Sequence, residues 1–337
     1  KKPGATVYDR TTQTRVAFNF TDAQTTFKKL ADQVFSRGGM NNNHPVLEAP
    51  GALFNLLCIE DDATRRTYVT KFMNGTNRQN GLNWMLNHCS ESGLWPESTG
   101  YSAGPHRIIL QMMEIVDRYD STLKVVENNK LMLENAFLYE NYRFPDNNSV
   151  MRFGDAHRTR LNSKAICERV LTISNRKGYE SIKQEAVQTL KSLYNEDGGF
   201  NPSVATQTLE WNNPLFLLWA VNVDVAGAVE TKYASAFSVG YSGITMQRNL
   251  NTSNTVEYGL MGYTGGAHYV HSHLSGIDME LYGLGAVLGT GGGDVGAANR
   301  GDVIFRNYHR IYAGHNTVII NGKSKGGGAN SWKSDGL

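Results

Sequence analysis

Residues 234–240, Ala-Ser-Ala-Phe-Ser-Val-Gly, and residues 244–248, Ile-Thr-Met-Gln-Arg, mark the place where the sequence changes character. Both segments are short, contain aromatic and β-branched residues, and are separated by glycine, which is typical of β-strands joined by tight turns. Similar segments follow at 255–263, 277–288, 303–312 and 317–321, and some alternate, as Val303 and Phe305 do. The chain after about residue 225 therefore predicts an antiparallel β-sheet.

The chain before this point has the apolar spacing of helices. Thr21-Asp22-Ala23-Gln24 resembles a capping box ahead of the apolar residues Phe27, Leu30, Val34 and Phe35. Short links rich in Gly, Asn and Ser separate the other expected helices, which are 47–58, 63–73, 80–88, 105–119, 121–142, 160–174 and 179–195. Many antiparallel helices on short links predict a helical bundle or an α/α toroid.

Helices followed by strands predict two segregated parts and an α+β fold. We place the helical domain at residues 1–222 and the antiparallel β-sheet domain, with a sandwich-like plan, at 223–337. Because such a sheet would normally continue, we expect the natural chain to extend beyond Leu337.

Composition narrows the class of function. The 33 Lys and Arg residues nearly balance the 31 Asp and Glu residues, giving a net charge of +2, which argues against a nucleic-acid partner bound by bulk charge. An acidic sugar polymer needs only a locally basic cleft. No apolar run has the length of a membrane span. The three cysteines have no metal-site spacing, and Cys58, in the apolar run 56–59, is expected to be buried.

Four stretches carry residues suited to chemistry. They are Asn42-Asn43-His44, the segment 93–101 from Gly93 to Tyr101, the segment 268–273 (His-Tyr-Val-His-Ser-His) with the strand 278–282 behind it, and the segment 308–318, which contains His315-Asn316-Thr317. Three of the nine histidines fall within 268–273, so this cluster is the strongest signal of a site.

These motifs resemble the heparinase II/III-type polysaccharide lyases, a family that includes alginate lyases. The His-x-His element before a strand, the later His-Asn-Thr, and Phe153-Gly154-Asp155 look like motifs of that family in the same order, and Asn43-His44 is similar to the Asn-His pair of the alginate-lyase branch. The resemblance implies an incomplete α/α toroid followed by antiparallel β-sheet. It also implies a secreted or periplasmic bacterial-type enzyme that cleaves a uronate-containing glycan, most of all alginate, by β-elimination at the C4–O bond. No leader precedes Lys1-Lys2, so export is inferred from the substrate.

β-Elimination explains the residue types. The C5 proton of a uronate is weakly acidic, so the carboxylate must be neutralised before an enolate-like intermediate can form, and Asn43 and His44 are our candidates for this donation. A base then takes the proton and an acid protonates O4. One tyrosine can do both when the proton and O4 lie on the same face of the sugar ring, whereas opposite faces need a histidine base opposite a tyrosine acid. Tyr101 is the candidate tyrosine, and His268 or His271 is the candidate second base.

The resemblance also implies one structural divalent cation, zinc or a similar ion, and no organic cofactor. His273 and His315 match the family's ligand positions. The expected aspartate is missing, because Thr290 or Gly291 stands in its register, and Asp294 is the nearest substitute.

Other residues have two readings. Asn43-His44 could simply end a loop at a helix, and Tyr101 could pack at a helix entry; Trp95 suits either a sugar platform or the core. His88 and His106 are expected to be ordinary helix histidines. The candidates for binding the sugar chain are Trp95, Glu97, His157, Arg248, Tyr269, Tyr308 and Tyr312.

Four alternatives to an alginate lyase stay open. A uronate C5-epimerase shares the proton abstraction, and a heparin- or heparan-type lyase shares the whole reaction. A glycoside hydrolase would need two opposed carboxylates, for which Glu97 and Asp155 could serve. A non-catalytic glycan-binding protein would bind the polymer without turnover.

Overall fold

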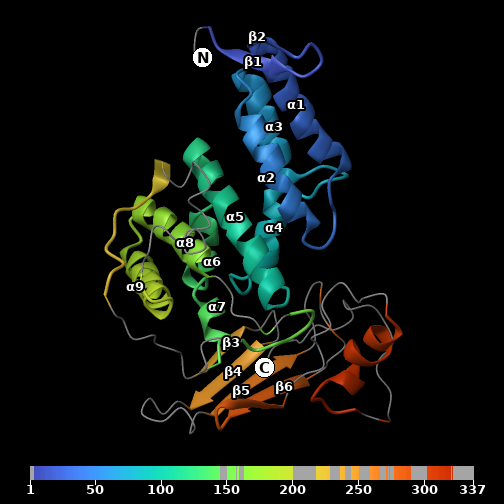
Figure 1. Cartoon of the computed structure of the whole chain (residues 1–337), viewed down its shortest axis with the longest axis vertical. Helices are drawn as coiled ribbons and strands as arrows, with labels where there is room; N and C mark the ends of the chain where they lie inside the picture. Colours follow the sequence, from blue (N-terminus) through green and yellow to red (C-terminus); the bar gives the residue numbers. More distant parts are fainter. Residues whose placement is uncertain are drawn as a thin grey trace. The chain divides into compact units, whose positions relative to one another are not determined.

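The computed structural model describes residues 4–144, 150–156, 158, 163–199, 218–227, 236–239, 244–249, 259–265, 271, 273, 277–289, 302–319 and 321. They fall into two units, Lys1–Met85 and Leu86–Leu337. In the described part of the chain, helices α1 to α9 precede the five strands β3 to β7 (Figure 1). The predicted boundary between residues 222 and 223 stays a prediction.

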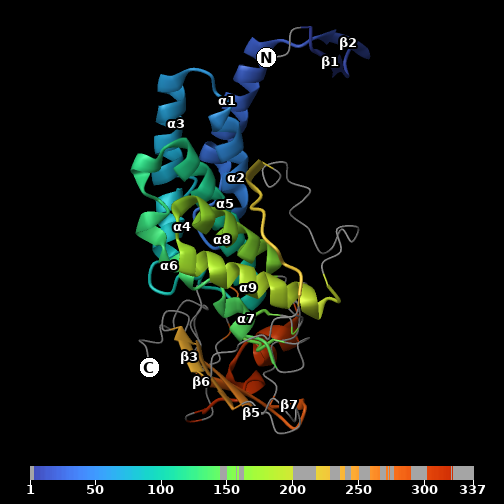
Figure 2. The ribbon, with the colours of Figure 1, turned by 90° about the vertical axis from the view of Figure 1, so that its left-hand side faces the viewer.

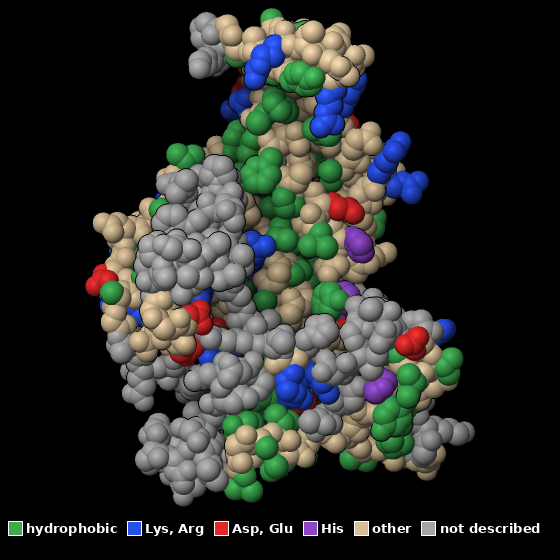
Figure 3. All heavy atoms as spheres, viewed as in Figure 1, with side chains coloured by type: hydrophobic (Ala, Val, Ile, Leu, Met, Phe, Trp, Pro, Cys, Tyr) green, Lys and Arg blue, Asp and Glu red, His purple; other side chains and the backbone are tan. Residues whose placement is uncertain are grey.

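The first unit combines a hairpin with three long helices. Strands β1 (Thr6–Asp9) and β2 (Thr14–Ala17) pair antiparallel, and they were not predicted. Helices α1 (Phe20–Arg37), α2 (His44–Leu57) and α3 (Asp62–Asn74) follow. Their buried faces supply a core that includes Phe35, Leu53, Leu56 and Phe72. On the face shown in Figure 3, Lys and Arg side chains gather over the hairpin and the helices next to it.

Two local predictions for this unit were wrong. Helix α1 is capped by Asn19 and not by Thr21, because the Asn19 side chain accepts hydrogen bonds from the backbone N–H groups of Thr21 and Asp22 at 3.0 and 3.4 Å. Cys58 is exposed although it belongs to the apolar run 56–59. It is the C-cap residue of α2, where the chain leaves the buried face of the helix.

The second unit begins with the last turn of α4 (Leu82–Cys89), followed by α5 (Thr99–Tyr119). The helix predicted over 121–142 is broken into two 3₁₀ turns, Ser121–Leu123 and Glu127–Asn129, and two short helices, α6 (Leu131–Glu134) and α7 (Leu138–Asn141). The break starts where Asp120 caps a turn and Lys124 takes a left-handed backbone with φ +51°. A left-handed residue cannot continue an α-helix.

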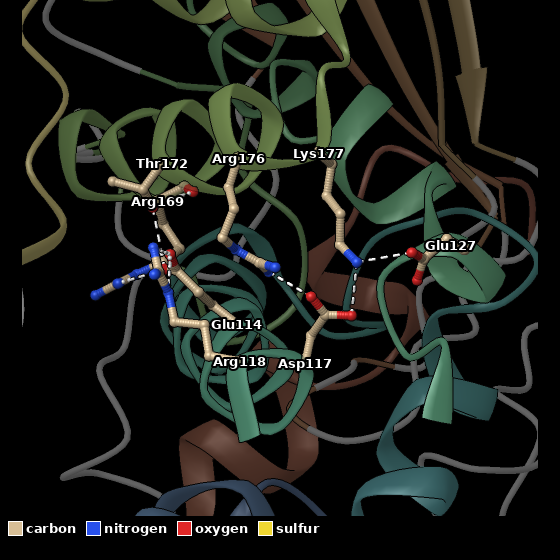
Figure 4. A network of polar contacts seen from close by, with 8 residues as sticks. All are labelled: Glu114, Asp117, Arg118, Glu127, Arg169, Thr172, Arg176 and Lys177. Carbon is tan, nitrogen blue, oxygen red and sulfur yellow. Dashed lines mark hydrogen bonds and ion pairs between the residues drawn. The ribbon is translucent and has the colours of Figure 1, made fainter. Parts of the chain in front are cut away.

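Helices α8 (Lys164–Lys177) and α9 (Glu180–Glu196) pack against each other, and α8 also packs on α5 (Figures 1 and 2). A buried ionic network joins α5 to α8 (Figure 4). Glu114 on α5 accepts from Arg169 and Thr172 on α8 at 2.8 and 3.0 Å. The carboxylates of Glu114 and Asp117 are fully or almost fully buried, so each needs the cations around it. The other members of the network are Asp117, Arg118, Glu127, Arg176 and Lys177.

The sheet of the second unit is antiparallel with the strand order β3-β4-β5-β6-β7. Its strands are Ala236–Val239, Ile244–Asn249, Gly259–Gly265, Ile277–Gly283 and Ala286–Gly289. Side chains alternate as expected of a sheet covered on one face. In β6, Asp278, Glu280 and Tyr282 are buried, whereas Met279 and Leu281 are exposed.

The buried face of the sheet is unusually charged, and its charges join it to the segment 141–158. Arg248 of β4 donates to Asn141, and Glu280 of β6 accepts from Arg158 at 2.6 Å and from the backbone N–H of Arg152 at 2.9 Å. Arg248 and Glu280 therefore each meet a polar partner from the part of the same unit that precedes the sheet.

The strand predicted at 303–312 is wrong. Phe305–His309 forms a π-helical turn and Tyr312–Gly314 a 3₁₀ turn. Val303 and Ile304 are both exposed and Phe305 is buried, so the apparent alternation does not describe two faces. Gly314 approaches the backbone of Tyr308 so closely that a Cβ there would lie 2.5 Å from its carbonyl oxygen, which marks a tight reversal. In the described part of 317–321 no strand forms.

None of the described helices is both long and apolar enough to cross a membrane.

Candidate active site

A tyrosine, a histidine and a glutamate meet in the second unit. Tyr101 lies in the first turn of α5, and its ring stacks on that of His271, with the ring centroids 3.6 Å apart and the planes within 8°. Glu97, four residues before Tyr101, places its carboxylate Oε2 2.8 Å from Nδ1 of His271. The structure thus brings together two of the predicted catalytic residues.

The backbone of His271 is also held in place. Its φ is +56°, a left-handed conformation that costs a non-glycine residue energy and is often found at functional sites. The backbone N–H of Asp155 donates to the carbonyl oxygen of His271 at 2.8 Å. Gly154, with φ +61°, lies so close that a Cβ there would be 2.2 Å from the same oxygen. The loop Phe153-Gly154-Asp155 therefore clamps the backbone of the histidine segment, and only glycine fits at its centre.

Two further histidines form a second cluster next to this loop. His273 Nε2 lies 2.8 Å from Asp155 Oδ1, and His315 Nδ1 lies 2.7 Å from Asp278 Oδ2. The remaining nitrogens, His273 Nδ1 and His315 Nε2, face each other at 3.2 Å. Burial lowers the pKa of His273, although its hydrogen bond to Asp155 opposes this shift. A neutral His273 is the form that binds a metal ion.

This second cluster suits the predicted divalent cation in two respects. Zinc–nitrogen bonds of about 2.0–2.1 Å at a tetrahedral angle place two ligand nitrogens roughly 3.4 Å apart, close to the observed spacing. Metal-binding imidazoles commonly bind a carboxylate through their other nitrogen, as both of these do. Among the described residues no group of three side chains completes a site, and the predicted third ligand, Asp294, lies outside them.

The predicted neutralising pair, Asn43 and His44, lies at the start of α2 in the first unit. Asn43 is the N-cap residue, is buried, and makes no capping hydrogen bond with its side chain, whereas His44 is exposed. Asn42 has φ +59° and accepts from the backbone N–H of His44 at 2.8 Å. Gln79 holds the loop by donating to the carbonyl of Pro45 at 3.0 Å. Action of this pair together with Tyr101 and His271 stays a prediction.

The structure corrects several of the residues predicted to bind sugar. Residues 92–99 are all buried, so Trp95 packs in the core beside His88 and offers no platform, and Glu97 binds His271 instead of facing solvent. Arg248 is buried against Asn141, and Tyr312 is also buried, which raises the pKa of its hydroxyl. Tyr308 is exposed.

Four predicted residues lie outside the described residues: His157, His268, Tyr269 and Asp294.

The carboxylates that hold the second histidine cluster were not predicted for that role. Asp155 was predicted as part of the Phe153-Gly154-Asp155 motif and as half of a hydrolase pair, and Asp278 as part of a strand. A signal was present, because Asp278 and Glu280 alternate on one face of β6, where an ordinary covered sheet would carry apolar side chains.

Comparisons with known proteins show similarity in sequence and in fold. The sequence model described as "Endo-acting ulvan lyase 2nd domain" matches residues 91–233. An endo-acting ulvan lyase of Formosa agariphila is 37% identical over 303 residues, which cover 88% of this chain and 37% of the relative. The crystal structure of heparinase III superposes with a TM-score of 0.51 at 16% identity, covering 92% of this chain and 43% of that one.

The chain therefore spans less than half the length of either protein. The likeness to heparinase III confirms the predicted fold class, helices of an α/α toroid followed by antiparallel β-sheet. The chain is therefore similar in sequence to an endo-acting ulvan lyase over most of the 337 residues, and it shares its fold with heparinase III.

Proposed function

We propose that this protein takes part in cleaving an acidic, uronate-containing polysaccharide by β-elimination at the C4–O bond. The observation that carries the proposal is the pairing of Tyr101 with His271. Tyr101 stacks on the imidazole ring, Glu97 contacts Nδ1 at its edge, and the backbone N–H of Asp155 donates to the His271 carbonyl. A fixed acid–base pair of this kind is what proton transfer at a sugar ring requires.

The reaction assigns a role to each residue. His271 takes the C5 proton through Nε2, since its Nδ1 faces Glu97. The electron pair of the C–H bond forms the enolate-like intermediate, which needs hydrogen-bond donors at its carboxylate. Asn43 and His44 of the first unit stay our predicted candidates for this donation. The pair then forms the C4–C5 double bond and expels O4, which receives the proton of the Tyr101 hydroxyl. Proton return from His271 to Tyr101 resets the enzyme.

Ulvan is the first substrate to test, because the relative that matches 88% of this chain is named an ulvan lyase. Alginate, which we predicted from Asn43-His44, comes second and heparan-type chains third. Export to the periplasm or the medium follows from a polymeric substrate and is part of this proposal.

The glycoside-hydrolase alternative loses its carboxylates in the structure. Glu97 and Asp155 are both buried, and each already binds an imidazole, His271 and His273 respectively. An acid and a base that flank a glycosidic bond must instead face the sugar.

We assign the second histidine cluster a structural part. His273 and His315 would hold a divalent cation there, and its binding energy would stabilise the folded state. Asp155 and Asp278 orient the two imidazoles toward each other.

The test is the ultraviolet absorbance of a new C4–C5 double bond when the protein is given ulvan, alginate or heparan sulfate. Tyr101→Phe keeps the ring on His271 and removes the proton, so kcat should fall by roughly 10²–10⁴-fold with an unchanged melting temperature. Tyr8→Phe, on the exposed hairpin, is the matched control and should keep kcat. Inverted C5 configuration without chain cleavage would identify an epimerase, and new reducing ends without the absorbance would identify a hydrolase.

A further inference from the structure

We propose that Glu97 is a positioning residue that fixes the tautomer of His271. Its carboxylate accepts the Nδ1 proton, and this leaves the lone pair on Nε2 to receive a proton from the substrate. The inference rests on the proposed function, in which His271 is the base. Glu97 itself gains no proton during the reaction.

The environment of Glu97 shows a carboxylate placed for one partner. Its side chain is fully buried, and Oε2 lies 2.8 Å from Nδ1 of His271. The other oxygen, Oε1, is buried and has no hydrogen-bond partner among the described residues. A buried carboxylate with half of its acceptors unused lowers stability. Such a cost is typical of a group kept for function.

The free nitrogen of His271 is the complementary observation. Across the described ranges, no hydrogen bond reaches Nε2, whereas Nδ1 has Glu97. The two other carboxylate–imidazole pairs differ, because the second nitrogens of His273 and His315 face each other at 3.2 Å. Only the Glu97 pair therefore leaves an imidazole nitrogen open for a proton, as a general base requires.

One short segment supplies both contacts to the imidazole ring. Glu97 precedes Ser98, the N-cap residue of α5, and Tyr101 lies in the first turn of the same helix. Glu97 therefore holds the edge of the His271 ring and Tyr101 holds its face. Ser102 fixes the segment by donating to the carbonyl of Trp95, and its hydroxyl lies 2.7 Å from that of Tyr139. This rigidity makes Glu97 suited to positioning a catalytic group.

Glu97→Gln is the decisive variant, because glutamine has the same shape and its amide can donate to Nδ1, which would move the ring proton to Nε2. With ulvan as the probe, kcat should fall by roughly 10²–10⁴-fold, as for other imidazole-orienting carboxylates, with KM within about threefold. The melting temperature should stay equal or rise, since a buried charge is removed.

Two controls separate positioning from a structural role. Glu140→Gln removes another buried carboxylate, one that pairs with Arg143 at 2.7 Å; it should lower the melting temperature and keep kcat. The double variant Glu97→Gln with His271→Ala should be no slower than His271→Ala alone, because Glu97 acts through His271. Full kcat in Glu97→Gln, or a further loss in the double variant, overturns the inference and leaves the proposed function intact.

A measurement without substrate keeps the inference testable if no polymer is cleaved. Nitrogen-15 chemical shifts of the His271 ring report which nitrogen carries the proton. The wild-type protein should show a protonated Nδ1 and a bare Nε2, and Glu97→Gln should reverse or mix the two. A wild-type ring with its proton on Nε2 refutes the role of Glu97, whatever the activity.

Discussion

Replacing Gly154 by alanine should both destabilise the second unit and slow catalysis. The added Cβ would lie 2.2 Å from the carbonyl oxygen of His271 and 3.2 Å from Cβ of Ser98. The first contact is with backbone, which cannot rotate away as a flexible side chain can. The Phe153-Gly154-Asp155 loop and the His271 segment must therefore separate by roughly 1 Å to restore van der Waals distances.

The cost has three parts. Alanine at φ +61° pays about 1–2 kcal/mol of left-handed strain. The separation weakens the hydrogen bond from Asp155 N–H to the His271 carbonyl, worth about 1 kcal/mol. Overpacking adds about 1–3 kcal/mol. Together these parts lower the free energy of unfolding by about 3–6 kcal/mol. A displacement of roughly 1 Å at His271, the proposed base, should lower kcat about 10²-fold.

Gly178→Ala is the matched control. Gly178 ends α8 with φ +71°, and nothing lies within 4 Å of its added Cβ, so this variant pays the left-handed strain alone. Urea unfolding of both variants gives the two losses, and their difference measures the clamp on His271. If Gly154→Ala loses no more stability than Gly178→Ala and keeps kcat, the clamp does not exist.

Three other perturbations follow from the structure. Arg169→Met should lower the free energy of unfolding in urea by about 3 kcal/mol, because the buried Glu114 loses one of the two cations that pair with it. Arg66→Met breaks only an exposed pair and should cost under about 1 kcal/mol; equal losses in the two variants would contradict this. Burial lowers the pKa of His106 to about 4. Between the usual 6.5 and 4 the unfolded chain therefore binds a proton that the folded one does not, so stability falls as pH falls, by up to about 3 kcal/mol, and His106→Gln should flatten that slope in unfolding curves. His315→Ala should lower the melting temperature and abolish any effect of a chelator, with metal content measured by elemental analysis; a metal-free wild-type protein contradicts the assignment.

The local spacing of apolar residues was enough to predict most of the helices and strands. The helices α2, α3, α5, α8 and α9 and the strands β3 and β4 lie within a few residues of their predicted ranges, except that α5 starts six residues earlier than predicted. The single strand predicted at 277–288 is instead two antiparallel strands, β6 and β7. Apolar spacing repeats within each element, so it can be read without knowing the fold. The same rule failed at 303–312, because Phe305–His309 forms a π-helical turn instead of a strand. The close approach of Gly314 to the backbone of Tyr308 accompanies this turn.

In the candidate site, too, some residues could be predicted from the sequence and their contacts could not. The sequence by itself indicated Tyr101 and a base at His268 or His271, because a tyrosine at a helix entry and a histidine cluster before a strand are local motifs. Only the tertiary structure decided that Glu97 and His271, 174 positions apart, form a pair, that Asp155 holds His273 across 118 positions, and that Trp95 lies in the core. Contacts of this kind depend on how distant segments pack, and no periodicity within either segment records which partner it will meet.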